Sequence, residues 1–236
     1  MSNSFMAIAQ ARLTSRRFPR KIFANIGSKM LIEHVNDYCS KNFKNNYIFA
    51  IPQTKNNDEL FNFLNNKDLP VYRGEEDNVL KRYRDIIEKY EPEFFIRVTA
   101  DNPYKCPNII DKMLNIFLGG KMKLLTNSVL KTFPLGLEIE IIDSEYFLYN
   151  TKNFKNVDYL EHVTLGLYHN FKKDVKHFMA TSDNSDIRFT IDYEDDLKFI
   201  SKINQNLLYE KNYLTLLESF NKVTGSMRKT GDYYIQ

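Results

Sequence analysis

Five basic residues and two hydroxyl side chains crowd into one short segment near the start of the chain. The segment reads QARLTSRRFPRK over residues 10–21, and it follows an apolar run at 5–11. Arginine forks and backbone amides suit the oxygens of a triphosphate, which carries several negative charges. Because GxxxxGK[ST] is absent, this is not a glycine-rich P-loop. The segment predicts a phosphate-binding loop, with a solvated basic loop or an RNA-contacting patch as the open alternatives.

Two aspartates stand far apart in the chain, each at the end of an apolar run. Asp101 follows residues 94–99 in RVTADNP, and Asp192 follows residues 187–191 in FTIDYEDDL. Mg²⁺ takes one or two carboxylates together with phosphate oxygens and water, and paired carboxylates of this kind serve phosphoryl transfer. We therefore expect Asp101 and Asp192 to share one Mg²⁺. Taken alone, Asp101 is more typical of an Asx turn, and the acids at 194–196 are more typical of a helix N-terminus.

Two weaker motifs complete the set. RGEEDNVL at 73–80 places a glycine beside an arginine and acids, where the backbone can approach a base or ribose, although a turn with an N-cap explains it as well. GLEIE at 136–140 and EHVT at 161–164 offer polar residues that could line an acceptor pocket. His162 on a helix is more typical of a hydrogen-bonded packing residue.

The elements that must position these residues alternate along the chain in the pattern of an α/β protein. In such sheets ligands bind outside the carboxyl ends of the strands, which is where residues 12–21, Asp101 and Asp192 would stand. The tail from residue 225 is polar and is expected to be loose. A cap is expected at residues 119–120. We predict strands at 5–11, 47–51, 70–72, 94–99, 123–126, 135–142, 176–181 and 187–191, and helices at 30–38, 60–64, 79–90, 109–117, 159–171, 197–207 and 214–223.

Composition limits the classes of function. The 236 residues are 43% hydrophobic, enough for a sizeable core, and we expect a single domain over 1–236 with a small acceptor-binding or dimerisation embellishment around 130–185. A net charge of +3 argues against a dedicated nucleic-acid binder. Cys39 and Cys106 have no metal-ligand spacing. No apolar stretch is long enough to span a membrane, and no signal peptide is evident, so we expect a cytoplasmic protein without a membrane partner.

Read in order, the motifs resemble the cytidylyltransferase family that includes CMP-acylneuraminate and CMP-Kdo synthetases, and within it the spore-coat polysaccharide protein F branch. That branch has QARMGSTRLPGK against QARLTSRRFPRK here, RGSEDDVLxRY against RGEEDNVLKRY, and RxTADCP against RVTADNP. GLDVEV compares with GLEIEI, EHVT recurs at 161–164, and a VDTPEDL-like pattern matches IDYEDDL at 191–197. The departures are Thr14 and Arg20 where the branch has glycine, and Glu138 where it has aspartate.

The resemblance implies a Rossmann-like nucleotidyltransferase fold with a mostly parallel mixed sheet flanked by helices, a homodimer, and Mg²⁺ as the cofactor. It places Arg12, Arg17 and Lys21 on the triphosphate, Asp101 and Asp192 on Mg²⁺, and residues 73–77 near the nucleoside. Together with the residue patterns, it leads us to expect four groups of site residues. The catalytic group is Arg17, Lys21 and Asp101; the nucleotide group is Gln10, Ala11, Arg12, Thr14, Ser15, Arg73, Gly74, Glu75, Asp77, Thr99 and Ala100; the acceptor group is Arg20, Glu138, Glu140, Glu161 and His162; and the metal group is Asp101 and Asp192.

The reaction that follows is transfer of CMP from CTP to a small anionic acceptor, with release of pyrophosphate, in capsule or surface polysaccharide biosynthesis. A phosphorylated metabolite such as phosphoglutamine is favoured, since a phosphate monoester is already nucleophilic and no motif carries a catalytic histidine or cysteine. A nonulosonic or Kdo-type sugar acid is the alternative acceptor. A non-catalytic nucleotide-binding domain and an RNA-binding protein are the alternatives from other classes.

Overall fold

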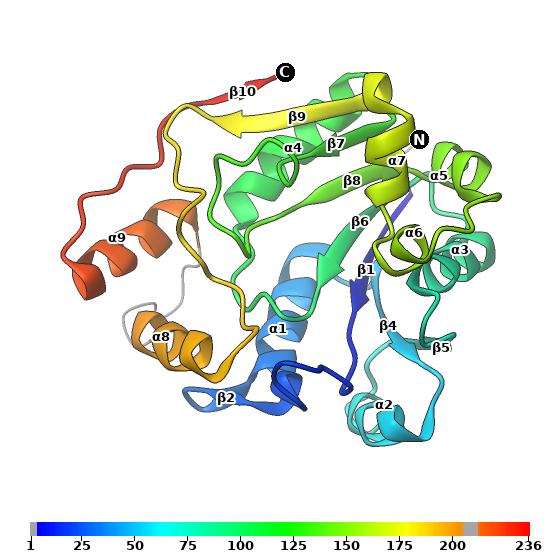
Figure 1. Ribbon diagram of the computed structural model, residues 1–236, viewed down its shortest axis with the longest axis horizontal. Coiled ribbons are helices and arrows are strands. Elements are labelled where there is room, and N and C mark those ends of the chain that lie inside the picture. Colours follow the sequence, from blue (N-terminus) through cyan, green and yellow to red (C-terminus); the bar gives the residue numbers. More distant parts are fainter. Residues whose placement is uncertain (1–3, 205–211) are drawn as a thin grey trace.

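One twisted sheet of eight strands runs through the protein, in the order β10-β9-β7-β8-β6-β1-β4-β5 (Figure 1). The computed structural model describes residues 4–204 and 212–236, so Leu207 of the predicted helix 197–207 lies outside the described residues. A separate ribbon joins β2 and β3. The strands are β1 Phe5–Gln10, β2 Asn25–Ile26, β3 Lys29–Met30, β4 Tyr47–Pro52, β5 Val71–Gly74, β6 Phe94–Thr99, β7 Leu124–Thr126, β8 Glu140–Asp143, β9 Val175–Ala180 and β10 Tyr233–Ile235.

The sheet is mostly parallel. β1 pairs in parallel with both β4 and β6, β4 with β5, and β7 with β9, whereas β8 runs antiparallel to β6 and β7, and β10 runs antiparallel to β9. The carboxyl ends of β5, β1 and β6 therefore share one edge, which carries Gly74, Gln10 and Thr99. This arrangement confirms the predicted fold class.

Helices cover both faces of the sheet. Residues of α1, α2, α4, α8 and α9 join one buried apolar cluster, and residues of α3, α5 and α7 join the other. Figure 1 shows these two layers with the sheet between them. The helices are α1 Leu31–Phe43, α2 Asp58–Asn65, α3 Val79–Tyr90, α4 Pro107–Gly119, α5 Ser144–Thr151, α6 Val157–Glu161, α7 Leu165–Asn170, α8 Glu194–Asn204 and α9 Tyr213–Thr224, with 3₁₀ turns η1 Lys21–Phe23, η2 Lys55–Asn57 and η3 Lys172–Asp174.

The central elements follow directly from their residues. Strand β1 lies between two parallel neighbours and has Ala7, Ile8 and Ala9 fully buried, which explains its unbroken apolar run. Helix α3 begins where the Asn78 side chain accepts a hydrogen bond from the Lys81 amide at 2.8 Å, and its apolar stripe faces the sheet. The bounds of β6 and α3 are those expected from the sequence. Among the described residues, no helix is long and apolar enough to cross a membrane.

The segment around Gly136 and the segment at 187–191 both differ from the prediction, because they pair with one another and not with the sheet. Of the expected strand 135–142, only Glu140–Asp143 joins the sheet, because Gly136 turns the chain with φ +107. Residues 187–191 are extended, but they make a single bridge, Leu135 to Arg188, and form no strand of the sheet. Their backbone pairs instead with Leu135 and with the Asp101 carbonyl, which accepts from the Ile191 amide at 2.9 Å.

Two further expectations were wrong. The predicted helix 159–171 is divided into α6 and α7, because His162 has non-helical backbone angles and Thr164 turns its hydroxyl to the buried Glu140 carboxylate at 2.7 Å. The polar tail is not loose throughout, since β10 pairs with β9 and the Tyr233 ring stacks on Phe178. The expected cap at 119–120 is confirmed, since Gly120 is the C-cap of α4 and its amide donates to the Ile116 carbonyl, with extended backbone angles (φ −121, ψ 154).

Candidate active site

Asp101 and Asp192 are 91 positions apart in the sequence, but their carboxylates contact the same ammonium group, that of Lys21. The Lys21 Nζ atom lies 3.1 Å from Asp101 Oδ2 and 3.0 Å from Asp192 Oδ1. It also donates to the Ile191 carbonyl at 2.7 Å. These three contacts use all three donors of an ammonium. Lys21 therefore clamps the turn after β6 to the segment that leads into α8.

The clamp is largely buried at its centre. The side chains of Lys21 and Asp192 are 10% and 13% exposed, whereas the Asp101 side chain is 33% exposed. Burial would raise the pKa of Asp101, but the charge of Lys21 and its hydrogen bond outweigh burial and leave that pKa below its usual value. Asp101 is therefore held ionised, in the form that binds a cation.

Two arginines surround the outer side of Asp192. Arg17 Nη2 lies 2.7 Å from Asp192 Oδ1, and its guanidinium lies 5.3 Å from the centre of the Tyr193 ring. A hydrogen bond with Tyr193 and the charge of Asp192 raise the pKa of Arg17 above its usual value. Arg188 Nη2 lies 3.3 Å from Asp192 Oδ2 and 3.3 Å from Asp196 Oδ2. Three cations thus surround the Asp101 and Asp192 carboxylates.

The donor set suits Mg²⁺. Both carboxylates reach one positive centre, so their oxygens converge on a common point. That pattern fits Mg²⁺, which uses one or two carboxylates and completes its shell with phosphate oxygens and water. For the ion to enter between the carboxylates, the Lys21 ammonium must give up at least part of its contacts.

The basic loop is folded tightly over this clamp, but its cations do not all point toward the aspartates. The Arg20 amide donates to the Leu13 carbonyl at 3.1 Å, and Arg20 itself has a left-handed backbone with φ 60. Its guanidinium forms two bonds of 2.6 Å to Glu59 on α2 and so lies away from the two aspartates. The left-handed backbone explains why glycine suits this position. The structure does not bring Arg20, expected at the acceptor, to the aspartate pair.

The remaining loop residues face the end of β5 and the segment after α6. Thr14 donates to Glu76 at 2.9 Å, and Ser15 closes a turn through its amide to the Leu13 carbonyl at 2.9 Å. Arg12 lies 3.5 Å from Glu161, and both are exposed. His162 is exposed at the C-terminal end of α6. The structure thus brings Glu161 and His162, expected at the acceptor, to the Arg12 end of the loop.

The expected nucleotide residues line the carboxyl edge of the sheet. Ala11 and Ala100 are buried and bond to neighbouring strands through their amides, and Thr99 accepts from Asn102 at 2.7 Å. Gly74 is buried at the end of β5, and Glu75 and Asp77 are exposed just beyond it. The Arg73 side chain turns toward α2, where it bonds Asp58 at 2.6 Å and lies over the Phe61 ring.

Gln10 and Glu140 belong to a buried network behind this edge. Gln10 Oε1 accepts from Arg97 Nε at 3.3 Å and from the Tyr83 hydroxyl at 3.2 Å. Arg97 Nη1 lies 2.5 Å from Glu140 Oε2, and Thr164 and Tyr168 donate to the other Glu140 oxygen. Both carboxylate oxygens of Glu140 are engaged, and 4% of the residue is exposed. Glu140, expected at the acceptor, therefore holds Arg97 in place, which in turn bonds Gln10. Burial would raise the pKa of Glu140, but Arg97 keeps it below its usual value.

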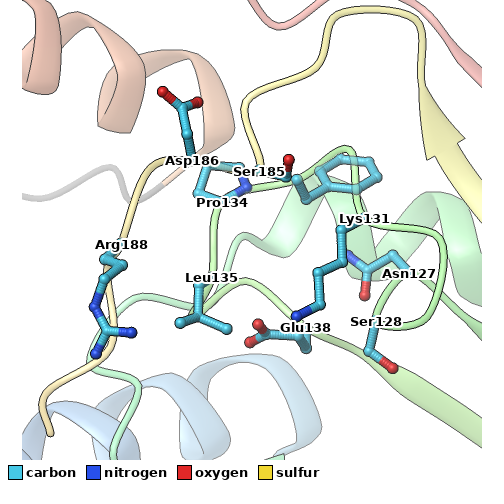
Figure 2. Close-up of a pocket in the computed structure, with 10 residues that line it drawn as sticks. Asn127, Ser128, Lys131, Pro134, Leu135, Glu138, Ser185, Asp186 and Arg188 are labelled. Carbon is cyan, nitrogen blue, oxygen red and sulfur yellow. The ribbon is translucent and has the colours of Figure 1, made fainter.

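A cavity of about 240 Å³ opens beside the clamp. Figure 2 shows Arg188 on one side of it and Lys131 on the other, with Leu135 and Glu138 between them. Arg188 connects the cavity to Asp192 through its 3.3 Å contact. Glu138 Oε2 accepts from the Gly136 amide at 2.8 Å and from Asn102 at 3.4 Å, next to Asp101. Of the expected acceptor residues, Glu138 is the one that lines this cavity.

Comparison with known proteins decides the family. The family model described as cytidylyltransferase matches residues 6–220. The chain belongs to the cytidylyltransferase family. A protein of uncharacterised function from Methanocaldococcus jannaschii is 26% identical over 232 residues, which cover 97% of this chain and 89% of that protein. The spore coat polysaccharide biosynthesis protein SpsF of Bacillus subtilis is 28% identical over 219 residues, covering 86% of this chain and 87% of SpsF.

Solved structures agree on the fold. A cytidylyltransferase from Leptospira borgpetersenii has a TM-score of 0.88 at 23% identity and covers 98% of this chain and 99% of its own. A CMP:2-keto-3-deoxy-manno-octonic acid synthetase, solved with CTP, has a TM-score of 0.64 at 13% identity over 87% of this chain and 100% of its own. The family resemblance read from the motifs is therefore confirmed, and so is the assignment of an enzyme of the CTP-dependent nucleotidyltransferase class.

Sequence reasoning missed two charged residues beside the clamp of this cytidylyltransferase. Lys131 lies in a loop without a motif, and Arg188 lies in a segment for which the sequence predicts a sheet strand. Arg188 carried a usable signal, because it stands four positions before Asp192, and side chains an even number of positions apart lie on the same side of an extended segment. Lys131 carried none, since only the fold brings it opposite Arg188.

Proposed function

We propose that this cytidylyltransferase transfers CMP from CTP to a small anionic acceptor, with Mg²⁺ held by Asp101 and Asp192 and with pyrophosphate leaving. The observation that carries the proposal is the convergence of the two carboxylates on Lys21 beneath an arginine-rich loop. Such a cluster suits a polyphosphate, because it offers a cation-binding pair and several cations within one site. The proposed pathway is capsule or surface polysaccharide biosynthesis, supported by the similarity to the spore coat polysaccharide biosynthesis protein SpsF.

The reaction needs little covalent chemistry from the protein. An acceptor oxyanion attacks the α-phosphorus of CTP, the new P–O bond forms in line with the bond to the β-phosphate, and pyrophosphate departs with that bonding pair. Bound Mg²⁺ would neutralise charge on the phosphate oxygens. Arg17, with 56% of its side chain exposed, is free to turn from Asp192 to the phosphates. Lys21, released from the carboxylates, can neutralise the charge that builds up on the leaving group.

The acceptor is proposed to occupy the cavity between Arg188 and Lys131. Both are cationic, and Arg188 joins the cavity to Asp192, so an anionic acceptor would be drawn to the side of the site where the α-phosphorus must lie. We favour a phosphorylated metabolite, because a phosphate monoester is already nucleophilic and its charge suits the two cations. A sugar acid is the second candidate, favoured by the fold shared with the CMP:2-keto-3-deoxy-manno-octonic acid synthetase.

The test is pyrophosphate release from CTP in the presence of Mg²⁺ across a panel of phosphorylated metabolites and 2-keto sugar acids. We expect turnover with a phosphorylated acceptor and none without a divalent cation. Turnover with sugar acids alone would select the second candidate. Absence of turnover with every nucleoside triphosphate and acceptor pair would contradict the proposed reaction.

A further inference from the structure

The side chain of Arg82 on α3 is buried without the partners that a buried guanidinium normally has. It is 2% exposed, and its Nε and Nη1 atoms have no hydrogen-bond partner among the described residues. Burying a charged donor without a partner is costly. Arg84, two positions along, shows the ordinary solution, since its Nη1 atom donates to the Leu148 carbonyl at 2.7 Å and to Thr151 at 2.9 Å.

The local structure accommodates Arg82 at a further cost. Arg82 is the fourth residue of α3, where the positive end of the helix dipole disfavours a cation. Its stem lies across Gly74, where an added Cβ atom would come within 2.7 Å of Arg82 Cγ. Burial lowers the pKa of Arg82 to about 10, and the nearby charge of Arg12 lowers it as well, although Tyr83 and Glu76 act in the opposite direction. The fold thus holds the Arg82 guanidinium, with two nitrogen atoms that lack a hydrogen-bond partner among the described residues, next to Gly74.

The position of Arg82 in the fold indicates which part of a bound nucleotide it would contact. Gly74 ends β5, and Asp101 follows β6, with β1 and β4 between them in the sheet. Three strand spacings of about 4.8 Å separate the two by about 14 Å. The basic loop after β1 lies between them. A nucleotide with its phosphates at Asp101 and Asp192 would therefore extend its nucleoside toward Gly74 and Arg82.

We propose that Arg82 is a specificity residue that donates hydrogen bonds to the carbonyl edge of the pyrimidine in the bound nucleotide. The inference rests on the proposed function, because that function places the phosphates at the aspartates. A guanidinium has donors and no acceptor. Cytosine presents the O2 and N3 acceptors side by side, whereas adenine has no carbonyl oxygen. Arg82 thereby favours CTP over ATP.

The experiment compares Arg82→Met with Arg84→Met, a matched control from the same helix. For each chain we measure the melting temperature without ligand, and the dissociation constants of CTP, ATP and inorganic tripolyphosphate by calorimetry. Tripolyphosphate reports the phosphate half of the site alone. Removing a hydrogen bond to a charged donor is expected to weaken CTP binding about 10- to 100-fold.

For Arg82→Met we expect weaker CTP binding, unchanged ATP and tripolyphosphate binding, and a melting temperature no lower than that of the wild type, because an unsatisfied buried charge is removed. For Arg84→Met we expect a lower melting temperature and unchanged CTP binding. Equal losses for CTP and tripolyphosphate would overturn the proposal, because Arg82 would then contact phosphate. A lower melting temperature with unchanged CTP binding would also overturn it, because the role would be structural.

If Arg82→Met does not fold, Arg82→Lys takes its place. A lysine keeps the charge but loses the planar fork, so CTP binding must still weaken while tripolyphosphate binding stays constant. A wild-type chain that binds tripolyphosphate but neither CTP nor UTP would refute the proposed function. Binding of UTP in place of CTP would refute the choice of cytidine alone, and Arg82 would then be tested on UTP, which carries the same O2 atom.

Discussion

Replacing Lys21 with methionine would remove the one side chain that bonds both aspartates. The two carboxylate oxygens lie 3.1 and 3.0 Å from the same Nζ atom, so they are no more than about 6 Å apart. At that distance, two like charges repel by about 3 kcal/mol at an effective dielectric constant of about 20. Arg17 and Arg188 remain on Asp192. We therefore expect Lys21→Met to lower the free energy of unfolding by about 3 kcal/mol, the lower end for breaking a buried ion pair.

The assay is thermal and urea unfolding at neutral pH, with and without MgCl₂ at constant ionic strength. A loss of about 3 kcal/mol corresponds to a fall in Tm of about 6–12 °C for a chain of this size. Because the methionine leaves the carboxylates facing one another, Mg²⁺ should stabilise the variant more than the wild type. At ten times its dissociation constant, the ion would restore about 1.4 kcal/mol.

The pH dependence gives a second readout of the same clamp. In the wild type, the pKa of Asp101 is below its usual value because of Lys21. Its ionised form therefore stabilises the fold fully above the unfolded value of about 3.9, and this contribution is lost as the pH falls through the folded pKa. In Lys21→Met the cation is gone and burial raises the pKa of Asp101, so the destabilisation should shrink between pH 7 and pH 5. An unchanged Tm, or a loss that neither Mg²⁺ nor lower pH reduces, would refute the reasoning.

Four other changes are expected to separate chemistry from folding. Asp101→Asn should abolish pyrophosphate release while circular dichroism still reports a folded chain, with a lower Tm because the ion pair with Lys21 is lost, and full activity would show that the metal assignment is wrong. Gly136→Ala should cost about 1–3 kcal/mol, because a Cβ would lie 2.7 Å from the Phe189 carbonyl carbon at φ +107; Gly119→Ala, with nothing within 4 Å of its Cβ, is the urea-melt control and should not destabilise. Arg20→Gly should raise Tm by relieving the left-handed backbone, because the exposed ion pair with Glu59 contributes little; a lower Tm would contradict this. Lys131→Met should raise the KM for the acceptor and leave the KM for CTP unchanged in steady-state assays, and a change in the CTP constant alone would remove Lys131 from the acceptor cavity.

The half of the fold built from parallel strands could be predicted because its apolar runs are buried on both faces. Ala7–Ala9 and the stripe of α3 show this directly, and they also placed the basic loop and Asp101 at the carboxyl edge. The later half could not be predicted in the same way. The alternation around Gly136 indicates a strand, but a left-handed turn sends that segment out of the sheet to pack beside residues 187–191. The local pattern of apolar and polar residues does not reveal which distant segment a strand-like stretch will pair with.

The candidate site, like the fold, could be predicted from the sequence only in part. The pairing of Asp101 with Asp192 was expected from two separate strand ends, and the structure brings them together even though residues 187–191 form no sheet strand. The ammonium between them was not expected, since Lys21 was assigned to the triphosphate. Glu140 shows the opposite failure, because an acid that alternates out of an apolar segment suggests an exposed site residue, whereas the fold buries it on Arg97. Which polar residue faces a ligand depends on tertiary partners.

The sharing of one divalent ion by Asp101 and Asp192 is tested most directly by electron paramagnetic resonance of Mn²⁺ titrated into the protein with CTP. The account predicts one tightly bound Mn²⁺ per chain in the wild type, and loss of that site in Asp101→Asn and in Asp192→Asn alike. Retention of wild-type Mn²⁺ binding in either variant would contradict it.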